Sequence, residues 1–231
     1  NVSVSFSAPY VATETAAPTP LPAPSCGSLR VTGLNACALD VTGSTDLNSA
    51  LDQVTDQRIE KVVIHFQQGK FTASETLDLR RSFSTELICN STKTGSCILE
   101  LDKDHQTDNT LVQAEYNSLA VTGMHLQHAC IGISAQHMSE LFVTDTILTN
   151  IAPHETATKN YCKIVSVTGS GVRMNNVTNA LITRCNISKS YTGLELQDVK
   201  NSVVRNTNVE KTHNYGVKIL GDSSGIAFEQ A

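Results

Sequence analysis

Tryptophan is absent from this chain of 231 residues, and aromatic residues make up only 5% of it. No apolar run approaches the roughly 18 residues of a transmembrane helix, so no membrane span is predicted. Basic residues are few, because 17 Lys and Arg stand against 22 Asp and Glu and leave a net charge of −5. No two cysteines have the C-x-x-C spacing of a zinc site. These absences argue against nucleic-acid binding and against a structural zinc site.

The abundant residues are short and polar: Ser and Thr together number 48, and Asn numbers 16. Such residues favour strands and turns over helices. The length allows one large domain or two small ones. The composition therefore indicates a protein built mainly from strands.

Seven cysteines are many for a protein of a reducing compartment, and disulfides formed in an oxidising compartment explain them better. Neighbours along the chain suggest three bridges, although six cysteines allow other pairings. The suggested bridges are Cys26–Cys37, Cys89–Cys97 and Cys130–Cys162, with Cys185 left as a buried free thiol. The chain begins with Asn1 rather than Met, which fits a removed signal peptide or a fragment. We therefore expect a secreted, extracellular protein.

Four asparagines stand in N-x-Ser/Thr sequons, which are acceptors for N-linked glycans in secreted proteins. They are Asn1, Asn90, Asn176 and Asn186. The sequence therefore predicts a glycoprotein with glycans at these positions.

Three regions follow one another along the chain. Residues 1–7 alternate Val2, Val4 and Phe6 with polar residues, the pattern of a strand with one apolar face. Residues 8–25 hold five of the six prolines and predict an extended linker. Residues 26–231 are expected to form the folded domain.

Within that domain, apolar residues at helical spacing predict one helix over residues 46–57, with Thr45 or Asp46 as its N-cap. Short apolar segments separated by polar turns predict strands from residue 61 onward. The expected strands are 61–66, 76–79, 86–89, 97–101 and 111–114.

An internal repeat marks the C-terminal half. Apolar segments begin at Leu119, Leu141, Ala180 and Ser202, at spacings of 22, 39 and 22 residues. A further apolar residue follows in each repeat, and then a strand that begins with glycine. A period near 22 residues with three short strands is typical of one coil of a solenoid. The longer spacing predicts an insertion near residues 150–170.

These repeated segments, together with the helix that would cap the first coil, resemble the right-handed parallel β-helix proteins, the superfamily of pectate lyases, polygalacturonases and phage tailspikes. The resemblance covers about residues 46–228 and implies an all-β, right-handed parallel β-helix with an N-terminal capping helix. This scaffold carries lyases, hydrolases, adhesins and structural modules, so it implies no single function.

Alternation within the strands assigns side chains to the two faces of each sheet. It predicts one interior column: Leu126, Leu148, Ile187 and Val209. It predicts one outward column of mixed charge: Ser134, Arg173, Glu195 and Lys218. A second outward column is wholly apolar: Ala120, Phe142, Leu181 and Val203. Such an exposed stripe is normally covered by a loop or a partner, and the insertion near 150–170 is one candidate cover.

No catalytic motif is recognisable. Polygalacturonase-like enzymes carry clustered aspartates and a Gly-His-Gly segment, and this sequence has neither Asn-Thr-Asp, Asp-Asp nor Gly-His-Gly. Pectate-lyase-like chemistry needs a calcium-binding aspartate cluster with a basic residue, and no matching outward cluster is predicted in the coils. These absences favour a non-enzymatic function.

Two groups of residues are candidates for metal binding. Asp102, Asp104 and Asp108 share one loop and offer oxygens to Ca²⁺, but the loop lacks the Gly and the terminal Glu of an EF-hand, so a solvated acidic turn explains them better. Strict alternation sends His125 and His128 to opposite faces, which argues against a histidine metal site there. Apart from the weak calcium candidate, no cofactor is expected.

The preferred function is an extracellular structural module, such as a fibre, coat or adhesin subunit. It would assemble head-to-tail through the strand of Val2, Val4 and Phe6. The alternatives are a polysaccharide lyase or glycoside hydrolase, and a carbohydrate-binding module without turnover.

Overall fold

The computed structural model describes residues 22, 24–43, 46–102, 110–151 and 169–230. The predicted strand at residues 1–7 and most of the predicted linker lie outside these residues, as does most of the predicted insertion. In the part of the chain that is described, no helix is long and apolar enough to cross a membrane.

Three sheets, here called sheets A, B and C, make up the molecule. Sheet A contains β1 (Arg30–Val31), β2 (Ala36–Val41), β3 (Lys61–Phe66), β6 (Ser84–Cys89), β9 (Leu119–Thr122), β12 (Leu141–Thr144), β15 (Ala180–Thr183), β18 (Lys200–Arg205) and β21 (Ser224–Glu229). Sheet B contains β4 (Gly69–Ala73), β7 (Cys97–Leu101), β10 (Met124–Ala129), β13 (Ile147–Ile151), β16 (Asn186–Ser190) and β19 (Asn208–Glu210). Sheet C contains β5 (Leu77–Leu79), β8 (Thr110–Glu115), β11 (Ile131–Met138), β14 (Ser170–Val177), β17 (Thr192–Gln197) and β20 (Tyr215–Leu220).

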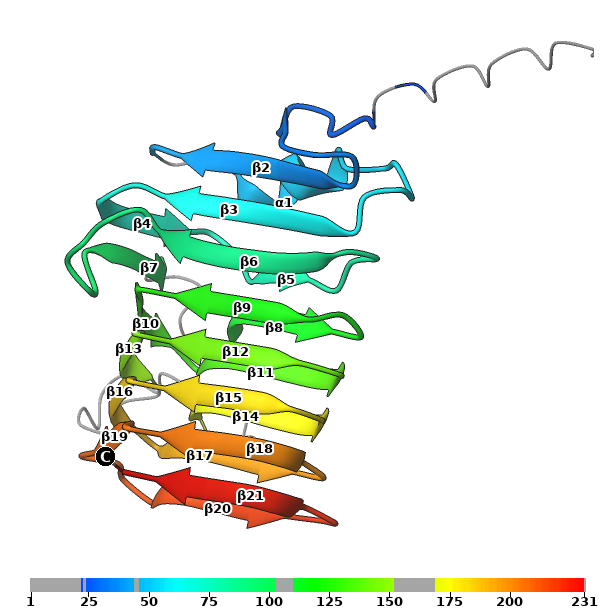
Figure 1. Ribbon diagram of the computed structural model, residues 1–231. Helices are drawn as coiled ribbons and strands as arrows, with labels where there is room; N and C mark the ends of the chain where they lie inside the picture. The colour runs from blue at the N-terminus through cyan, green and yellow to red at the C-terminus, as the bar shows by residue number, and fades with distance from the viewer. Residues whose placement is uncertain (1–21, 23, 44–45, 103–109, 152–168, 231) are drawn as a thin grey trace, which may run out of the picture.

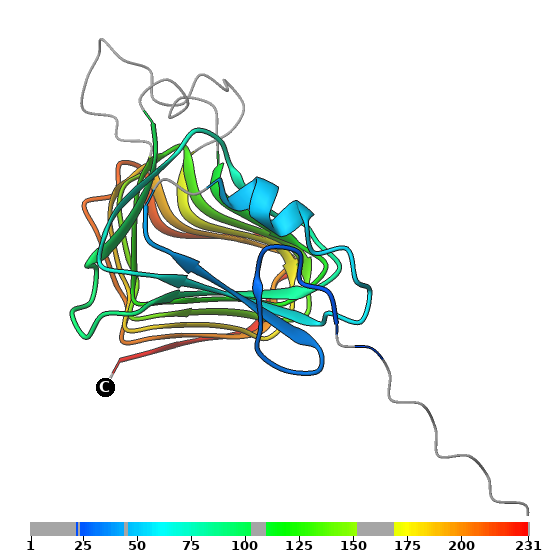
Figure 2. The same ribbon diagram turned by 90° about the horizontal axis from the view of Figure 1, so that it is seen from above.

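The chain runs from sheet A to sheet B to sheet C and then begins the next coil, so successive coils stack along one axis (Figure 1). Every strand pair is parallel except β1 with β2. Seen along the stack, the coils superpose around one enclosed interior (Figure 2). The predicted parallel β-helix is therefore confirmed.

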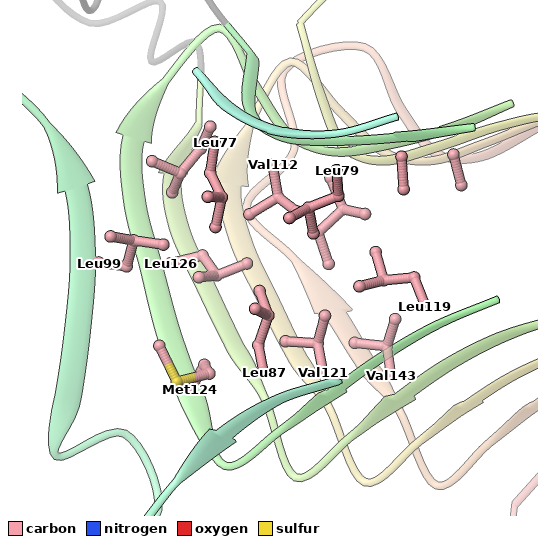
Figure 3. Packing of buried hydrophobic residues seen from close by; sticks show 14 of the residues in the cluster. Leu77, Leu79, Leu87, Leu99, Val112, Leu119, Val121, Met124, Leu126 and Val143 are labelled. Atoms are coloured by element: carbon pink, nitrogen blue, oxygen red, sulfur yellow. The ribbon is translucent and has the colours of Figure 1, made fainter. Parts of the chain in front are cut away.

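Register places like residues above one another in the interior. Leu126 aligns with Leu148, Leu148 with Ile187, and Ile187 with Val209. The first three are fully buried and Val209 is half-buried, which confirms the predicted column. Neighbouring leucines and valines of the three sheets fill the same interior (Figure 3). Each such side chain stabilises the fold by about 1.5–3 kcal/mol through its removal from water.

The corners between sheets are made by residues with positive φ. Asp145 (φ 50°) and Arg184 (φ 53°) turn the chain from sheet A into sheet B, and Gly123 does so in the coil before them. Asn150 (φ 53°) and Lys189 (φ 52°) stand in the same column at the corner between sheets B and C. A left-handed residue reverses the inward and outward alternation of side chains, so each corner resets the pattern.

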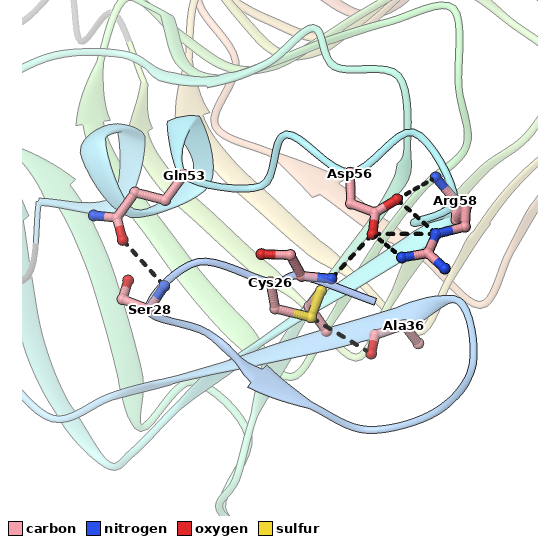
Figure 4. The surroundings of a disulfide bond; sticks show 8 residues. Cys26, Ser28, Ala36, Gln53, Asp56 and Arg58 are labelled. Carbon is pink, nitrogen blue, oxygen red and sulfur yellow. Dashed lines mark hydrogen bonds and ion pairs between the residues drawn. A yellow bond between two sulfur atoms is a disulfide. The ribbon is translucent and has the colours of Figure 1, made fainter. Parts of the chain in front are cut away.

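The first coil is closed by α1 (Leu47–Asp52), whose N-cap Asp46 accepts a hydrogen bond from the Ser49 amide. The helix is shorter than predicted, since Gln53 is its C-cap. The side chain of Gln53 accepts a hydrogen bond from the Ser28 amide (3.1 Å; Figure 4). The disulfide Cys26–Cys37 fastens the segment before β2 beside this helix. The expected capping helix is thus present.

Candidate functional site

Polar and titratable side chains of successive coils gather on the outer face of sheet B. Glu100 on β7 and the segment from His125 to His128 on β10 supply them, and these two strands pair in parallel. Titratable groups that meet on a rigid sheet are candidates for binding or catalysis.

A nearly buried carboxylate, Glu100, lies on this face on β7, the strand next to the terminal strand β4. Its side chain is only 8% exposed. The Lys70 amine on β4 lies 2.7 Å from Glu100 Oε1. Gln127 Nε2 and His128 Nδ1, both on β10, lie 2.7 Å and 3.1 Å from Glu100 Oε2. Three strands of successive coils therefore converge on one carboxylate, and we call these four residues the Glu100 cluster.

The charges of the cluster follow from these contacts. Burial acts to raise the pKa of Glu100, but the hydrogen bonds from Lys70, Gln127 and His128 outweigh burial and lower it. His125 lies beside the cluster, with its Nε2 2.8 Å from Thr149 Oγ1. Burial lowers the pKa of His125, and the neighbouring His128 lowers it further. At neutral pH the site thus combines an ionised carboxylate, a lysine and an uncharged imidazole.

The prediction that His125 and His128 point to opposite faces is wrong. His128 has φ 56°, so the corner begins at this residue and the alternation ends before it. The next residue, Ala129, is buried, whereas the side chain of His128 is 37% exposed and contacts Glu100. Both imidazoles therefore belong to the same outer face.

Sequence patterns missed this cluster for two reasons. The strand β4 was not predicted, because its segment Gly-Lys-Phe-Thr-Ala has a single large apolar residue, Phe71. The register that places Lys70 and Glu100 on adjacent strands comes from coils of unequal length. The sequence shows a repeat period only in the later coils. Glu100 precedes those coils, so the period could not place it beside Lys70 and His128.

The outer face of sheet C carries the predicted column of mixed charge. Ser134, Arg173, Glu195 and Lys218 align across four coils. Glu195 accepts hydrogen bonds from Ser170 Oγ (2.7 Å) and Arg173 Nη2 (3.0 Å), and Lys218 Nζ lies 3.6 Å away. Arg173, Glu195 and Lys218 therefore form a connected network of hydrogen bonds and ion pairs.

The outward apolar column on sheet A is also in register. Phe142 aligns with Ala120 on one side and Leu181 on the other, and Leu181 aligns with Val203. Phe142 is 37% exposed, while the others are half-buried. Most of the insertion near 150–170, which was one candidate cover for this stripe, lies outside the described residues.

Two of the three predicted disulfides and the predicted free thiol are present in the structure. Disulfides join Cys26 to Cys37 and Cys89 to Cys97, and Cys185 is a buried free thiol. Cys130 is disulfide-bonded, and its predicted partner Cys162 lies outside the described residues. The sequon residues Asn90, Asn176 and Asn186 are exposed, and Asn1 lies outside the described part.

The calcium prediction stays a prediction, because Asp104 and Asp108 lie outside the described residues. Asp102 follows β7 and is half-buried. Among the described residues, no group of three or more His, Cys, Asp or Glu side chains is arranged to hold a metal ion.

Comparison with known proteins matches the chain to a family and, among solved structures, to an alginate lyase. The family described as "Right handed beta helix region" matches residues 110–230, more than half of the chain. An alginate lyase from Paenibacillus sp. str. FPU-7 shares 12% sequence identity at a TM-score of 0.36, over 84% of this chain and 98% of the lyase chain. No curated protein matches the sequence.

The prediction of a structural module that assembles head-to-tail is wrong. The comparison with known families connects the chain with right-handed β-helices, and this finding does not support an assembling subunit. The residues chosen for assembly, Val2, Val4 and Phe6, lie outside the described residues.

Proposed function

We propose that this chain, which belongs to the right-handed β-helix family, is a secreted polysaccharide lyase. Its active site would lie on the outer face of sheet B. The observation that carries this proposal is the contact of His128 Nδ1 with the nearly buried carboxylate of Glu100, at 3.1 Å. A carboxylate–imidazole pair of this kind orients a general base.

The proposed base is the second nitrogen of His128. When Nδ1–H donates to Glu100, the neutral ring keeps its lone pair on Nε2, which is then free to accept a proton. The side chain of His128 is 37% exposed, so a ligand on the outer face can reach it. Lys70 adds a cation to the same cluster, which favours an acidic sugar.

The reaction is a β-elimination from a uronic acid residue. His128 takes the proton from the carbon next to the carboxylate, and the electron pair of that C–H bond forms a carbon–carbon double bond. The glycosidic C–O bond breaks, and the leaving oxygen takes a proton from water. The hydroxide that remains takes the proton held by His128, which restores the neutral base and the water. Glycoside hydrolysis is supported less, because it needs a protonated carboxylic acid and the pKa of Glu100 is lowered.

The test is the ultraviolet absorbance of the unsaturated product when the protein is incubated with polygalacturonate or alginate. We expect the wild type to be active and His128→Ala to lose at least about 100-fold in kcat/KM. His65→Ala is the matched control, since His65 Nδ1 also contacts an oxygen, that of Asn90 at 3.2 Å, but on sheet A. Binding of either polymer without product would favour the carbohydrate-binding alternative, and equal activity of both variants would refute the role of His128.

Secretion and N-glycosylation belong to the same proposal. Two disulfides support an oxidising compartment, and the exposed positions of Asn90, Asn176 and Asn186 make these sequons accessible to a glycosyltransferase. Expression in a eukaryotic secretory host should give protein whose mass falls after treatment with an N-glycosidase. Unchanged mass would contradict glycosylation.

A further inference from the structure

We infer that the outer face of sheet C is a second polysaccharide-binding surface, which holds an extended chain along the stacking axis and apart from the Glu100 cluster. The inference rests on the proposed function only for the class of ligand. It concerns a different sheet and different residues, so the two can fail independently.

A ladder of uncharged amides runs along this face. Gln136 on β11 aligns with Asn175 on β14, and Asn175 aligns with Gln197 on β17. Neighbouring strands lie about 4.8 Å apart, a step comparable to the length of one sugar ring. Each amide offers both donors and an acceptor, and each sugar hydroxyl can do the same.

The ladder is not closed on itself. In the described part of the chain, the side chain of Gln136 makes one weak hydrogen bond, to Ser134 Oγ at 3.4 Å, and those of Asn175 and Gln197 make none. All three residues retain solvent contact. Their hydrogen-bonding groups are therefore available to a ligand, unlike those of an amide ladder bonded from coil to coil.

The neighbouring charged column supplies a fixed cation beside the ladder. Arg173 stands two residues before Asn175 on β14 and faces the same way. Its guanidinium is 20% exposed and is held by Glu195, through Nε at 3.1 Å and Nη2 at 3.0 Å. A guanidinium that is already oriented loses little freedom on binding an acidic or hydroxyl-rich ligand.

An exposed aromatic ring lies at the end of the ladder towards the first coil. Gln136 aligns with Glu115, and Tyr116 follows Glu115 with 67% of its surface exposed. Few aromatic residues are present in this chain, and a ring beside polar groups suits the apolar face of a sugar. The strands β8, β11, β14 and β17 are bonded on both sides, so this surface is a face and not an edge for strand addition.

The experiment compares two triple variants made in the His128→Ala background, which prevents cleavage of the polymer. One removes the ladder by Gln136→Ala, Asn175→Ala and Gln197→Ala. The matched control removes an aligned outward column of sheet A in the same three coils by Thr122→Ala, Thr144→Ala and Thr183→Ala. Binding is measured by electrophoretic retardation in gels that contain polygalacturonate or neutral hydroxyethylcellulose.

Loss of three hydrogen-bonding groups should raise the apparent Kd for at least one polymer about tenfold or more, with the sheet A control unchanged. Equal retardation of both triple variants, or no retardation of the parent protein, would overturn the inference. If the ladder variant fails to fold by circular dichroism, the exposed single variant Gln197→Ala decides instead, with a smaller rise in Kd expected. Turnover by the ladder variant with active His128, measured on short oligouronates, reports on the sheet B site separately.

Discussion

Adding one methyl group at Gly171 should destabilise the fold strongly, because the next coil lies too close to leave room for it. Gly132, Gly171, Gly193 and Gly216 stand in successive coils of sheet C. A Cβ atom at Gly171 would lie 2.7 Å from the carbonyl oxygen of Gly193 and 2.6 Å from Cγ2 of Ile187. Carbon atoms normally approach other heavy atoms to about 3.5–4.0 Å.

The size of the destabilisation depends on whether the atoms that the new methyl group would meet can move away. The obstacle at Gly193 is backbone, bonded into the ladder on both sides, so it cannot rotate away as a side chain would. Overpacking of this kind typically costs about 1–3 kcal/mol, and we expect Gly171→Ala in the upper half of that range. At Gly216 a Cβ would meet only Val209 Cγ1, at 3.9 Å. Gly216→Ala should therefore be neutral or stabilising by about 0.4–1 kcal/mol, through the reduced entropy of the unfolded chain.

Urea unfolding followed by circular dichroism measures both variants against the wild type. We expect the midpoint to fall for Gly171→Ala and to stay or rise for Gly216→Ala, with similar dependence on urea concentration. If the two variants are destabilised equally, the close packing inferred from the register is wrong.

Three further predictions concern charged and titratable groups. Burial raises the pKa of Cys185 to about 11; an unfolded thiol ionises near pH 8.5, so the free energy of unfolding should fall by up to about 3 kcal/mol between these pH values. Cys185→Ser lacks this titration, so its free energy of unfolding, measured by chemical denaturation, should fall less over the same pH range. Identical pH profiles of the variant and the wild type would contradict the raised pKa of Cys185. Burial acts to raise the pKa of Glu195, but Ser170 and Arg173 help to lower it, so its contribution is present at neutral pH and lost as pH falls through the folded pKa. Arg173→Met should therefore lower stability at neutral pH and move the acid-induced loss to higher pH, as read from urea midpoints across the acid range; an unshifted profile would refute the coupling. By contrast, Arg184→Ala breaks an exposed ion pair with Asp145, so it should shift the urea midpoint only slightly, and 1 M salt should reduce the shift further.

The repeat in the later coils predicted the fold because its period is set by the geometry of one coil. Leu126 and Leu148 could be paired from spacing alone, since only short connections separate the strands that lie between these two residues. The earlier coils contain longer connections, so the same spacing does not recur there. Strand β4, with one large apolar residue in Phe71, has no pattern to distinguish it from a loop.

The candidate site was less predictable because it depends on register between coils of unequal length. Lys70, Glu100 and His128 come from three strands separated by connections of different sizes. His128 also stands at a corner with positive φ, where strict alternation assigns the wrong face. Sheet C follows the regular coils, and its charged column from Arg173 to Lys218 was predictable for that reason.

The central claim, an active site on the outer face of sheet B, is tested most directly by a crystal structure of the His128→Ala variant soaked with a short acidic oligouronate. We predict that the saccharide lies over the Glu100 cluster, with a carboxylate or hydroxyl group within hydrogen-bonding distance of Lys70 or Gln127. A saccharide bound on sheet A, or on sheet C alone with sheet B empty, would contradict it.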